Sequence, residues 1–186
     1  MQGGVIPPAA AVRGTRLYLR ELRVDDVGAA YLGWMQDAEV MRFLESRFQE
    51  HSLDSLRDFV AHCAAEPDEL LMGIFRLEDG RHVGNIKLGR IDIAHGTADV
   101  GLLIGERECW GRGYATEAIR LVTRYAFGSL ALRKLTASCY STNGASAGAF
   151  QRAGFSVEGV RPRQYIDRGS FVDQVLLGLE RPAVQP

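Results

Sequence analysis

The chain has 186 residues, of which 46% are hydrophobic and 24% charged, and its formal net charge is -1. This composition is typical of a globular protein in water, and the length suits one domain with a substantial core. The near-neutral charge argues against nucleic acid as a partner, and no apolar run reaches the length of a membrane span. Because the three cysteines follow no metal-ligand spacing, we expect no metal site and a reducing, cytoplasmic location.

The N-terminal third is predicted to carry a tail, one strand and helices. Residues 1–14 are rich in Gly, Pro and Ala, which predicts a flexible tail, and residues 15–22 alternate like an edge strand. Ser52 is the predicted N-cap of the last helix of this region. Helical spacing of apolar residues predicts helices over 23–37, 38–48 (helix or turn) and 52–65.

Further along, alternating segments dominate and two helices interrupt them. Asp79-Gly80 predicts a hairpin between two alternating runs, and a further strand is expected over 97–105. Helical spacing returns from Tyr114, and a short helix over 144–153 is expected to end at Gly154. The last strands are predicted over 132–141, 155–161 and 170–180. Strands in a block with a few helices packed on them indicate an α+β sheet domain.

The stretch WGRGYATEA, residues 110–118, places two glycines directly before a helix. The first turn of a helix has amides without internal partners and positive potential, and glycines let an anion approach them closely. The stretch therefore predicts a phosphate or pyrophosphate site, with a plain strand-to-helix turn as the alternative. It is not a P-loop, which would end in Gly-Lys-Ser/Thr, nor a dinucleotide fingerprint, which would have Gly or Ala at position 116.

Together with NGASAGAFQRAGF at 143–155, this stretch resembles the GNAT superfamily of acyl-CoA-dependent N-acetyltransferases, in particular the RimJ/RimL branch. The resemblance runs from about Thr15 to Glu180. It implies one GNAT domain over 15–182: a single mixed, mostly antiparallel twisted sheet of about six to seven strands, with helices on both faces.

The resemblance implies acetyl-CoA as co-substrate, with its pyrophosphate on the amides of the glycine stretch and its pantetheine beside the strand over 97–105. Two positions depart from the family pattern. Trp110 stands where Gln or Arg is common, and Phe150 stands where many members have a tyrosine that protonates the leaving thiolate. Asn143 is expected both to cap its helix and to flank the pantetheine. The predicted cofactor-binding residues are Leu102, Ile104, Gly111, Arg112, Gly113, Tyr114, Ala115, Thr116, Asn143, Ser146 and Phe150.

Acetyl transfer needs a base for the acceptor ammonium and a proton for the departing thiolate. Asp99, in the strand ADVGL, resembles the acidic strand residue of the RimJ/RimL branch and is the predicted base; an exposed strand-end carboxylate is the alternative. Tyr140 is the predicted donor to the thiolate, directly or through water, with Ser138 and Ser141 of the same strand as alternatives. Since thiols have a pKa near 8.5, the reaction could also proceed without a dedicated acid.

The acceptor is expected to lie against residues 24–66, which in this family shape the acceptor pocket. The predicted substrate-binding residues are Trp34, Asp37, Arg42 and Arg47. An aromatic face can stack on a sugar or base and an arginine can bind phosphate, although ordinary solvated charges are the alternative. We therefore expect a small-molecule amine such as a nucleotide-linked amino sugar; the alternatives are a peptide N-terminus or a non-catalytic acyl-CoA-binding module. A monomer and a homodimer both fit the sequence.

Overall fold

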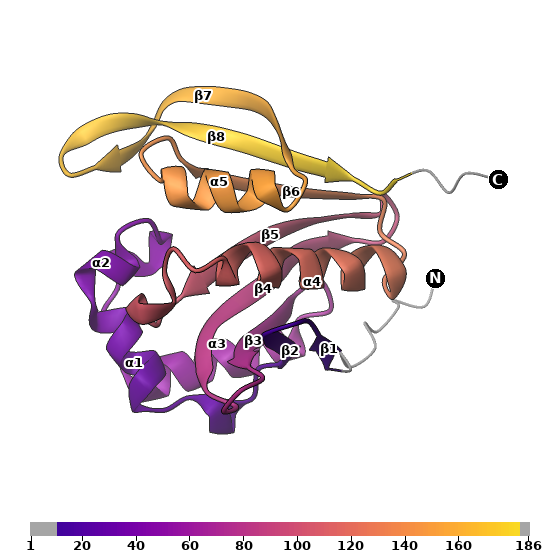
Figure 1. The fold of residues 1–186 in the computed structure, drawn as a ribbon. Coiled ribbons are helices and arrows are strands. Elements are labelled where there is room, and N and C mark those ends of the chain that lie inside the picture. The colour runs from indigo at the N-terminus through magenta and orange to yellow at the C-terminus, as the bar shows by residue number, and fades with distance from the viewer. Residues whose placement is uncertain (1–10, 183–186) are drawn as a thin grey trace.

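The computed structural model describes residues 11–182, whose strands form one eight-stranded sheet (Figure 1). The strand order is β1-β2-β3-β4-β5-β6-β8-β7, and every neighbouring pair is antiparallel except β5 and β6. The predicted α+β architecture and mostly antiparallel sheet are confirmed, with eight strands rather than six to seven. The strands are β1 Val12–Arg13, β2 Leu17–Glu21, β3 Leu70–Arg76, β4 His82–Asp92, β5 Thr97–Ile104, β6 Lys134–Tyr140, β7 Ser156–Asp167 and β8 Ser170–Glu180.

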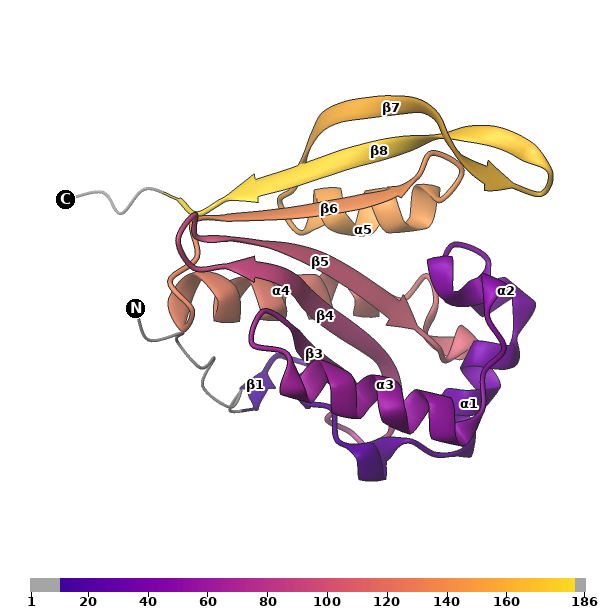
Figure 2. The same cartoon turned by 180° about the vertical axis from the view of Figure 1, so that it is seen from behind.

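Helices cover both faces of the sheet, as predicted. Figure 2 shows α1 and α3 in front of the sheet and α4 and α5 behind it. The α-helices are α1 Ala29–Gln36, α2 Ala38–Met41, α3 Leu53–Ala65, α4 Tyr114–Gly128 and α5 Gly144–Arg152, and short 3-10 turns lie at η1 Val24–Asp26, η2 Glu45–Phe48 and η3 Arg107–Cys109.

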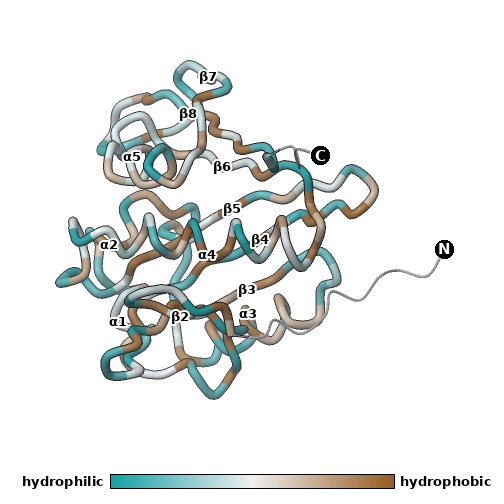
Figure 3. The backbone as a smooth tube through the Cα atoms, turned by 45° about the vertical axis from the view of Figure 1, so that its right-hand side comes forward, coloured by the Kyte–Doolittle hydropathy of each residue, from teal (hydrophilic) through white to brown (hydrophobic). Residues whose placement is uncertain are grey.

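The two helical layers create two apolar cores, which share the central strands. Along β3, Met72 and Ile74 belong to the core under α4, whereas Leu71 and Phe75 belong to the core under α1 and α3. Because successive side chains of a strand point to opposite faces, a strand covered on both sides must be apolar throughout. Figure 3 shows the resulting concentration of hydrophobic residues in the central strands.

The N-terminal segment departs from the sequence prediction. Val12 and Arg13 form β1 and pair with Leu19 and Tyr18 of β2, within a stretch predicted to be a flexible tail. The prediction was wrong at these residues because the edge of β2 offers backbone partners that local composition does not reveal. Residues 1–10 of the predicted tail lie outside the described residues.

The functional region depends on where β5 and β6 stop pairing. Their parallel pairing covers only Thr97 to Asp99 on β5 and Lys134 to Thr136 on β6. Beyond this point β5 continues along β4 and β6 continues along β8, so the two strands diverge (Figure 1). The second half of β5 therefore lacks a strand on its β6 side within the described chain.

Candidate active site

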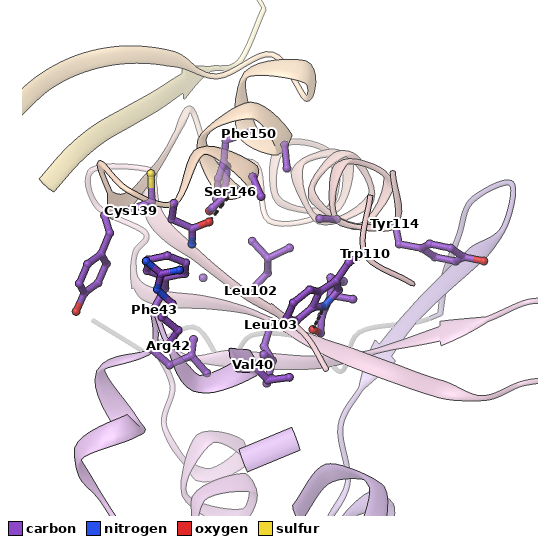
Figure 4. A pocket seen from close by; sticks show the side chains of 18 of the residues that line it. Val40, Arg42, Phe43, Leu102, Leu103, Trp110, Tyr114, Cys139, Ser146 and Phe150 are labelled. Carbon is purple, nitrogen blue, oxygen red and sulfur yellow. Dashed lines mark hydrogen bonds between the residues drawn. The ribbon is translucent and has the colours of Figure 1, made fainter. Parts of the chain in front are cut away.

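A cavity of about 820 Å³ opens where β5 and β6 diverge (Figure 4). Its floor is the end of β5, Val100 to Ile104. One side is formed by residues 109–111 and 113–116, without the predicted Arg112, and the opposite side combines the end of β6 with α5. The far end is formed by residues 39, 40 and 42–45 and by Tyr165 of β7, which are distant from the glycine stretch in the sequence.

The glycine stretch leads into α4 in a conformation that only glycine adopts readily. Gly111 has a φ of 70° and Gly113, the N-cap of α4, has a φ of 79°. Within the described residues, no hydrogen bond uses the backbone N–H groups of residues 111–116 as donors. Donors of this kind at the start of a helix bind anions, as the sequence predicted for this loop.

Thr116 adds a hydroxyl to these amides. Thr116 lines the cavity and is only 8% exposed. Its Oγ1 is buried and has no hydrogen-bond partner among the described residues. Because a buried hydroxyl without a partner costs free energy, such a group is usually explained by a ligand or ordered water. The residue types and the unused donors of this loop therefore fit a phosphate group.

Trp110 lies on the same side of the cavity, and its one polar side-chain atom already has a protein partner. Its Nε1 donates to the carbonyl oxygen of Ile104 at 2.8 Å, so the indole spans from the loop to the end of β5. Trp110 therefore contributes an apolar wall and a fixed β5 terminus, and supplies no donor to an anion. The predicted Leu102 and Ile104 both line the cavity.

The α5 side of the cavity matches the predicted face of that helix. The Oδ1 of Asn143 accepts from the N–H of Ser146 at 3.1 Å, which confirms the predicted N-cap, and both residues line the cavity. Phe150 is 2% exposed and packs edge-on against Phe155 with ring centroids 5.0 Å apart. Figure 4 shows Ser146 and Phe150 above the floor formed by Leu102. Phe150 therefore shapes the wall without offering a proton.

Tyr140 lies at the far end of the cavity in contact with a carboxylate that the sequence did not single out. Its hydroxyl donates to Oε1 of Glu45 at 2.6 Å, and its ring stacks on Tyr165 with centroids 4.1 Å apart. Burial and the bond to Glu45 raise the pKa of Tyr140 to about 12, so the phenol is neutral and carries a proton at pH 7. The sequence alone does not indicate Glu45, because a lone glutamate in a short turn has no distinguishing local pattern.

The two arginines predicted to bind the acceptor are hydrogen-bonded to other groups of the protein. Arg42 lines the cavity and makes two bonds to Asp167, from Nε at 3.2 Å and Nη2 at 2.8 Å. Arg47 donates to the carbonyl oxygens of Arg42 and Ile166, and it is not among the residues that line the cavity. These bonds join the 39–48 segment to the tip of the β7–β8 hairpin.

The other two predicted acceptor residues lie outside the cavity lining. Trp34 is buried in the core under α1, where its indole packs against Gly105 so closely that an added Cβ would lie 2.0 Å from Cδ2. Asp37 is the N-cap of α2, with Oδ1 accepting from the N–H of Glu39 at 2.9 Å. Sequence pattern alone does not separate a core indole or a capping carboxylate from residues of a binding site.

Asp99 is also absent from the cavity lining. It occupies the last paired position between β5 and β6, where its carboxylate accepts from Thr136 and forms an ion pair with Arg90. Both partners hold the carboxylate beside the paired part of the strands. The geometry therefore gives no support to Asp99 as the group that meets the acceptor amine.

Two features are absent from residues 11–182. No helix in this range is long and apolar enough to cross a membrane. Nor do three or more His, Cys, Asp or Glu side chains gather there in a way that could hold a metal ion.

Comparison with known proteins gives consistent results. The family model described as "Acetyltransferase (GNAT) domain" matches residues 16–156. An uncharacterized N-acetyltransferase of Bacillus subtilis, YokL, derived from the SPbeta prophage, is 29% identical over 90% of this chain and 92% of its own. Spermidine N-acetyltransferase of Vibrio cholerae, solved with CoA and spermine, has a TM-score of 0.79 at 21% identity and covers 90% of this chain and 96% of its own. A putative ribosomal-protein-serine acetyltransferase of the same organism has a TM-score of 0.73 at 20% identity, covering 94% and 99%.

Proposed function

The chain belongs to the GNAT acetyltransferase family and is an N-acetyltransferase, and we propose that it moves the acetyl group of acetyl-CoA to a primary amine of a small molecule. One observation carries the proposal. A single cavity joins the unused donors of the glycine stretch, at one end, to the Tyr140–Glu45 pair at the other. The cavity thus offers a phosphate site at one end and, at the other, a pair of side chains that can accept and donate a proton.

The cofactor is assigned to the glycine side. The backbone amides of Arg112 to Thr116 and the Thr116 hydroxyl would hold the pyrophosphate, because these are the donors without partners in the described chain. The β6-facing edge of β5 near Leu102 would pair with the pantetheine as an added strand does. When bound, acetyl-CoA supplies an acetyl group activated as a thioester. Asn143, Ser146 and Phe150 would close the other side.

The proton is assigned to Glu45 and Tyr140. Attack by the amine nitrogen forms a C–N bond and breaks the C–S bond, so one proton must leave nitrogen and one must reach sulfur. We assign Glu45 to accept the proton from nitrogen and Tyr140 to give its proton to sulfur, after which Glu45 returns a proton to the phenol through their 2.6 Å hydrogen bond. Asp99 is the second candidate for the base.

The charges at the far end favour one class of acceptor over another. A nucleotide-linked amino sugar would need cationic groups for its phosphates, but Arg42 is bonded to Asp167 and Arg168 lies 3.4 Å from Glu39. We therefore place an amine without phosphates ahead of the amino-sugar nucleotide. The V. cholerae relative named for spermidine is consistent with a small amine; the relative named for a ribosomal protein supports the RimJ/RimL branch and a peptide N-terminus as the second candidate.

A thiol-release screen tests the acceptor. The panel comprises polyamines, amino acids, aminoglycosides, amino-sugar nucleotides and N-terminal peptides, each with acetyl-CoA. We expect turnover with small amines. Turnover confined to peptides or to amino-sugar nucleotides would contradict the acceptor assignment, and CoA binding without any turnover would indicate a non-catalytic acyl-CoA-binding module.

Three matched variants test the proton assignment. Glu45→Gln and Tyr140→Phe keep the size of the side chains, and each should lower kcat by about 10²-fold with little change in CoA affinity. Asp99→Asn should leave kcat within about threefold of wild type, because Asp99 does not line the cavity. The opposite ranking would return the role of base to Asp99.

A further inference from the structure

The glycine stretch is tied to the N-terminal strand through one carboxylate. Glu117, in the first turn of α4, accepts from the backbone N–H groups of Thr15, Arg16 and Leu17 at 2.9, 2.8 and 3.2 Å. The Nε of Arg16 donates to its second oxygen at 2.9 Å. Burial acts to raise the pKa of Glu117, but these bonds outweigh it and hold the pKa below its usual value, so the carboxylate is charged at pH 7.

The chain before β2 leaves room for this carboxylate. A Cβ added to Gly14 would lie 2.6 Å from Oε1 of Glu117, closer than Cβ atoms approach other heavy atoms. Glu117 therefore occupies the space that a side chain at position 14 would fill. Its carboxylate also holds the Nε end of the Arg16 guanidinium in place.

Arg16 reaches from this anchor to the glycine stretch. Its Nη1 donates to the carbonyl oxygen of Arg112 at 2.7 Å, and its guanidinium lies 4.8 Å from the centre of the Tyr114 ring. In a planar trans peptide the C=O and the following N–H point in opposite directions. Since Arg16 holds the Arg112 carbonyl on its own side, the N–H of Gly113 points away from Arg16.

We propose that Arg16, oriented by Glu117, is a positioning residue for the cofactor: it fixes the Arg112–Gly113 peptide so that the Gly113 N–H faces the phosphate site. The inference rests on the proposed function, because it supposes that this loop binds the pyrophosphate of acetyl-CoA. Gly113 lines the cavity and Arg16 does not, which is consistent with an Arg112 carbonyl turned to Arg16 and a Gly113 N–H turned to the cavity.

The surrounding residues explain why such a tie is needed. Gly111 and Gly113 both have positive φ, and glycine permits many backbone conformations. A rotated Arg112–Gly113 peptide would present a carbonyl oxygen, which repels phosphate, in place of the N–H. With Trp110 bonded to Ile104 instead of offering a donor, the backbone amides carry more of the binding and their orientation matters more.

The test compares two acetyl donors, acetyl-CoA and acetyl-pantetheine, of which the second has no pyrophosphate. Arg16→Met keeps an aliphatic stem against Tyr114 and removes every donor. We expect its KM for acetyl-CoA, and its Kd for CoA, to rise about tenfold, the equivalent of one hydrogen bond to a charged group. Its kcat, and its KM for acetyl-pantetheine, should equal those of wild type. The KM of Arg16→Lys for acetyl-CoA should lie between those of wild type and Arg16→Met, since a single ammonium group replaces the planar guanidinium.

Arg124→Met is the matched control. Arg124 also connects α4 to the N-terminal segment, since its Nη2 donates to the carbonyl oxygen of Arg13 at 2.7 Å, but it lies further along α4 than the glycine stretch. This variant should change neither KM. Equal losses in both variants, a loss of Arg16→Met with both donors, or unchanged CoA affinity in Arg16→Met would each overturn the positioning role. If wild type had the same KM for acetyl-CoA and acetyl-pantetheine, the assignment of the loop to the pyrophosphate would be wrong, and this inference with it.

Discussion

Replacement of Thr116 by valine separates cofactor binding from folding. Valine has nearly the shape of threonine and lacks the hydroxyl, and Oγ1 of Thr116 is buried without a partner in the described chain. A buried hydroxyl without a partner costs about 1–3 kcal/mol, so its removal should leave the free energy of unfolding unchanged or raise it by about 1 kcal/mol. For a chain of this size such a gain raises Tm by about 2–4 °C.

The affinity of Thr116→Val for CoA should fall, although its stability is unchanged or higher. A hydrogen bond to a charged phosphate contributes about 1.5–3 kcal/mol, and each 1.4 kcal/mol is a factor of ten in Kd. Thr116→Val should therefore raise the Kd for CoA by about 10- to 100-fold. Calorimetric titration measures the Kd, and thermal unfolding without ligand measures the stability.

The same helix provides the control. Oγ1 of Thr123 is likewise buried without a partner in the described chain, and Thr123 does not line the cavity. Thr123→Val should match Thr116→Val in stability and keep the Kd of wild type. An unchanged Kd in Thr116→Val, or an equal change in both variants, would refute the assignment of the Thr116 hydroxyl to the phosphate.

Three further predictions follow from the same geometry. Gly113→Ala and Gly80→Ala both place a side chain at positive φ and should each lose about 1–2 kcal/mol of stability, but only Gly113→Ala should weaken CoA binding in a titration. Phe150→Leu should keep substantial activity and lose stability through packing alone; a collapse of kcat with normal CoA binding would contradict this. Burial lowers the pKa of His82 below the 6.5 of the unfolded chain, so its contribution to stability falls as pH drops below 6.5; urea unfolding should show a larger loss between pH 7 and pH 5 in wild type than in His82→Phe.

Local features of the structure were predictable from the sequence because they depend on residues within a few positions of one another. Ser52 caps α3 through the N–H of Ser55, and Asn143 caps α5 through the N–H of Ser146. The hairpin at Gly80 and the start of α4 at Tyr114 follow from the same short-range rules. The glycine stretch and the start of α4 are recognisable in the sequence because both depend on such short-range rules.

The far end of the cavity was decided by the tertiary structure. Tyr140 meets Glu45 across 95 positions of sequence, and Arg42 meets Asp167 across 125. Trp34 is of a residue type that often binds ligands, but it lies in the core under α1, because Gly105 leaves space for its indole. No local pattern encodes such pairings, since each depends on where the sheet brings two distant segments.

The sequence by itself determined the starts of α3, α4 and α5, the turn at Gly80 and the loop that fits a phosphate, because backbone preferences and hydrogen bonds within one turn fix them. It did not determine the start of α1, since the helix predicted over 23–37 is a 3-10 turn at Val24–Asp26 followed by α1 from Ala29. The tertiary structure decided which charges are free to act. Asp99 and Glu45 are both acidic residues of the same chain, and their chemistry is alike in isolation. Asp99 is held by Thr136 and Arg90 beside the paired strands, whereas Glu45 faces the cavity, because β5 and β6 separate immediately after Asp99.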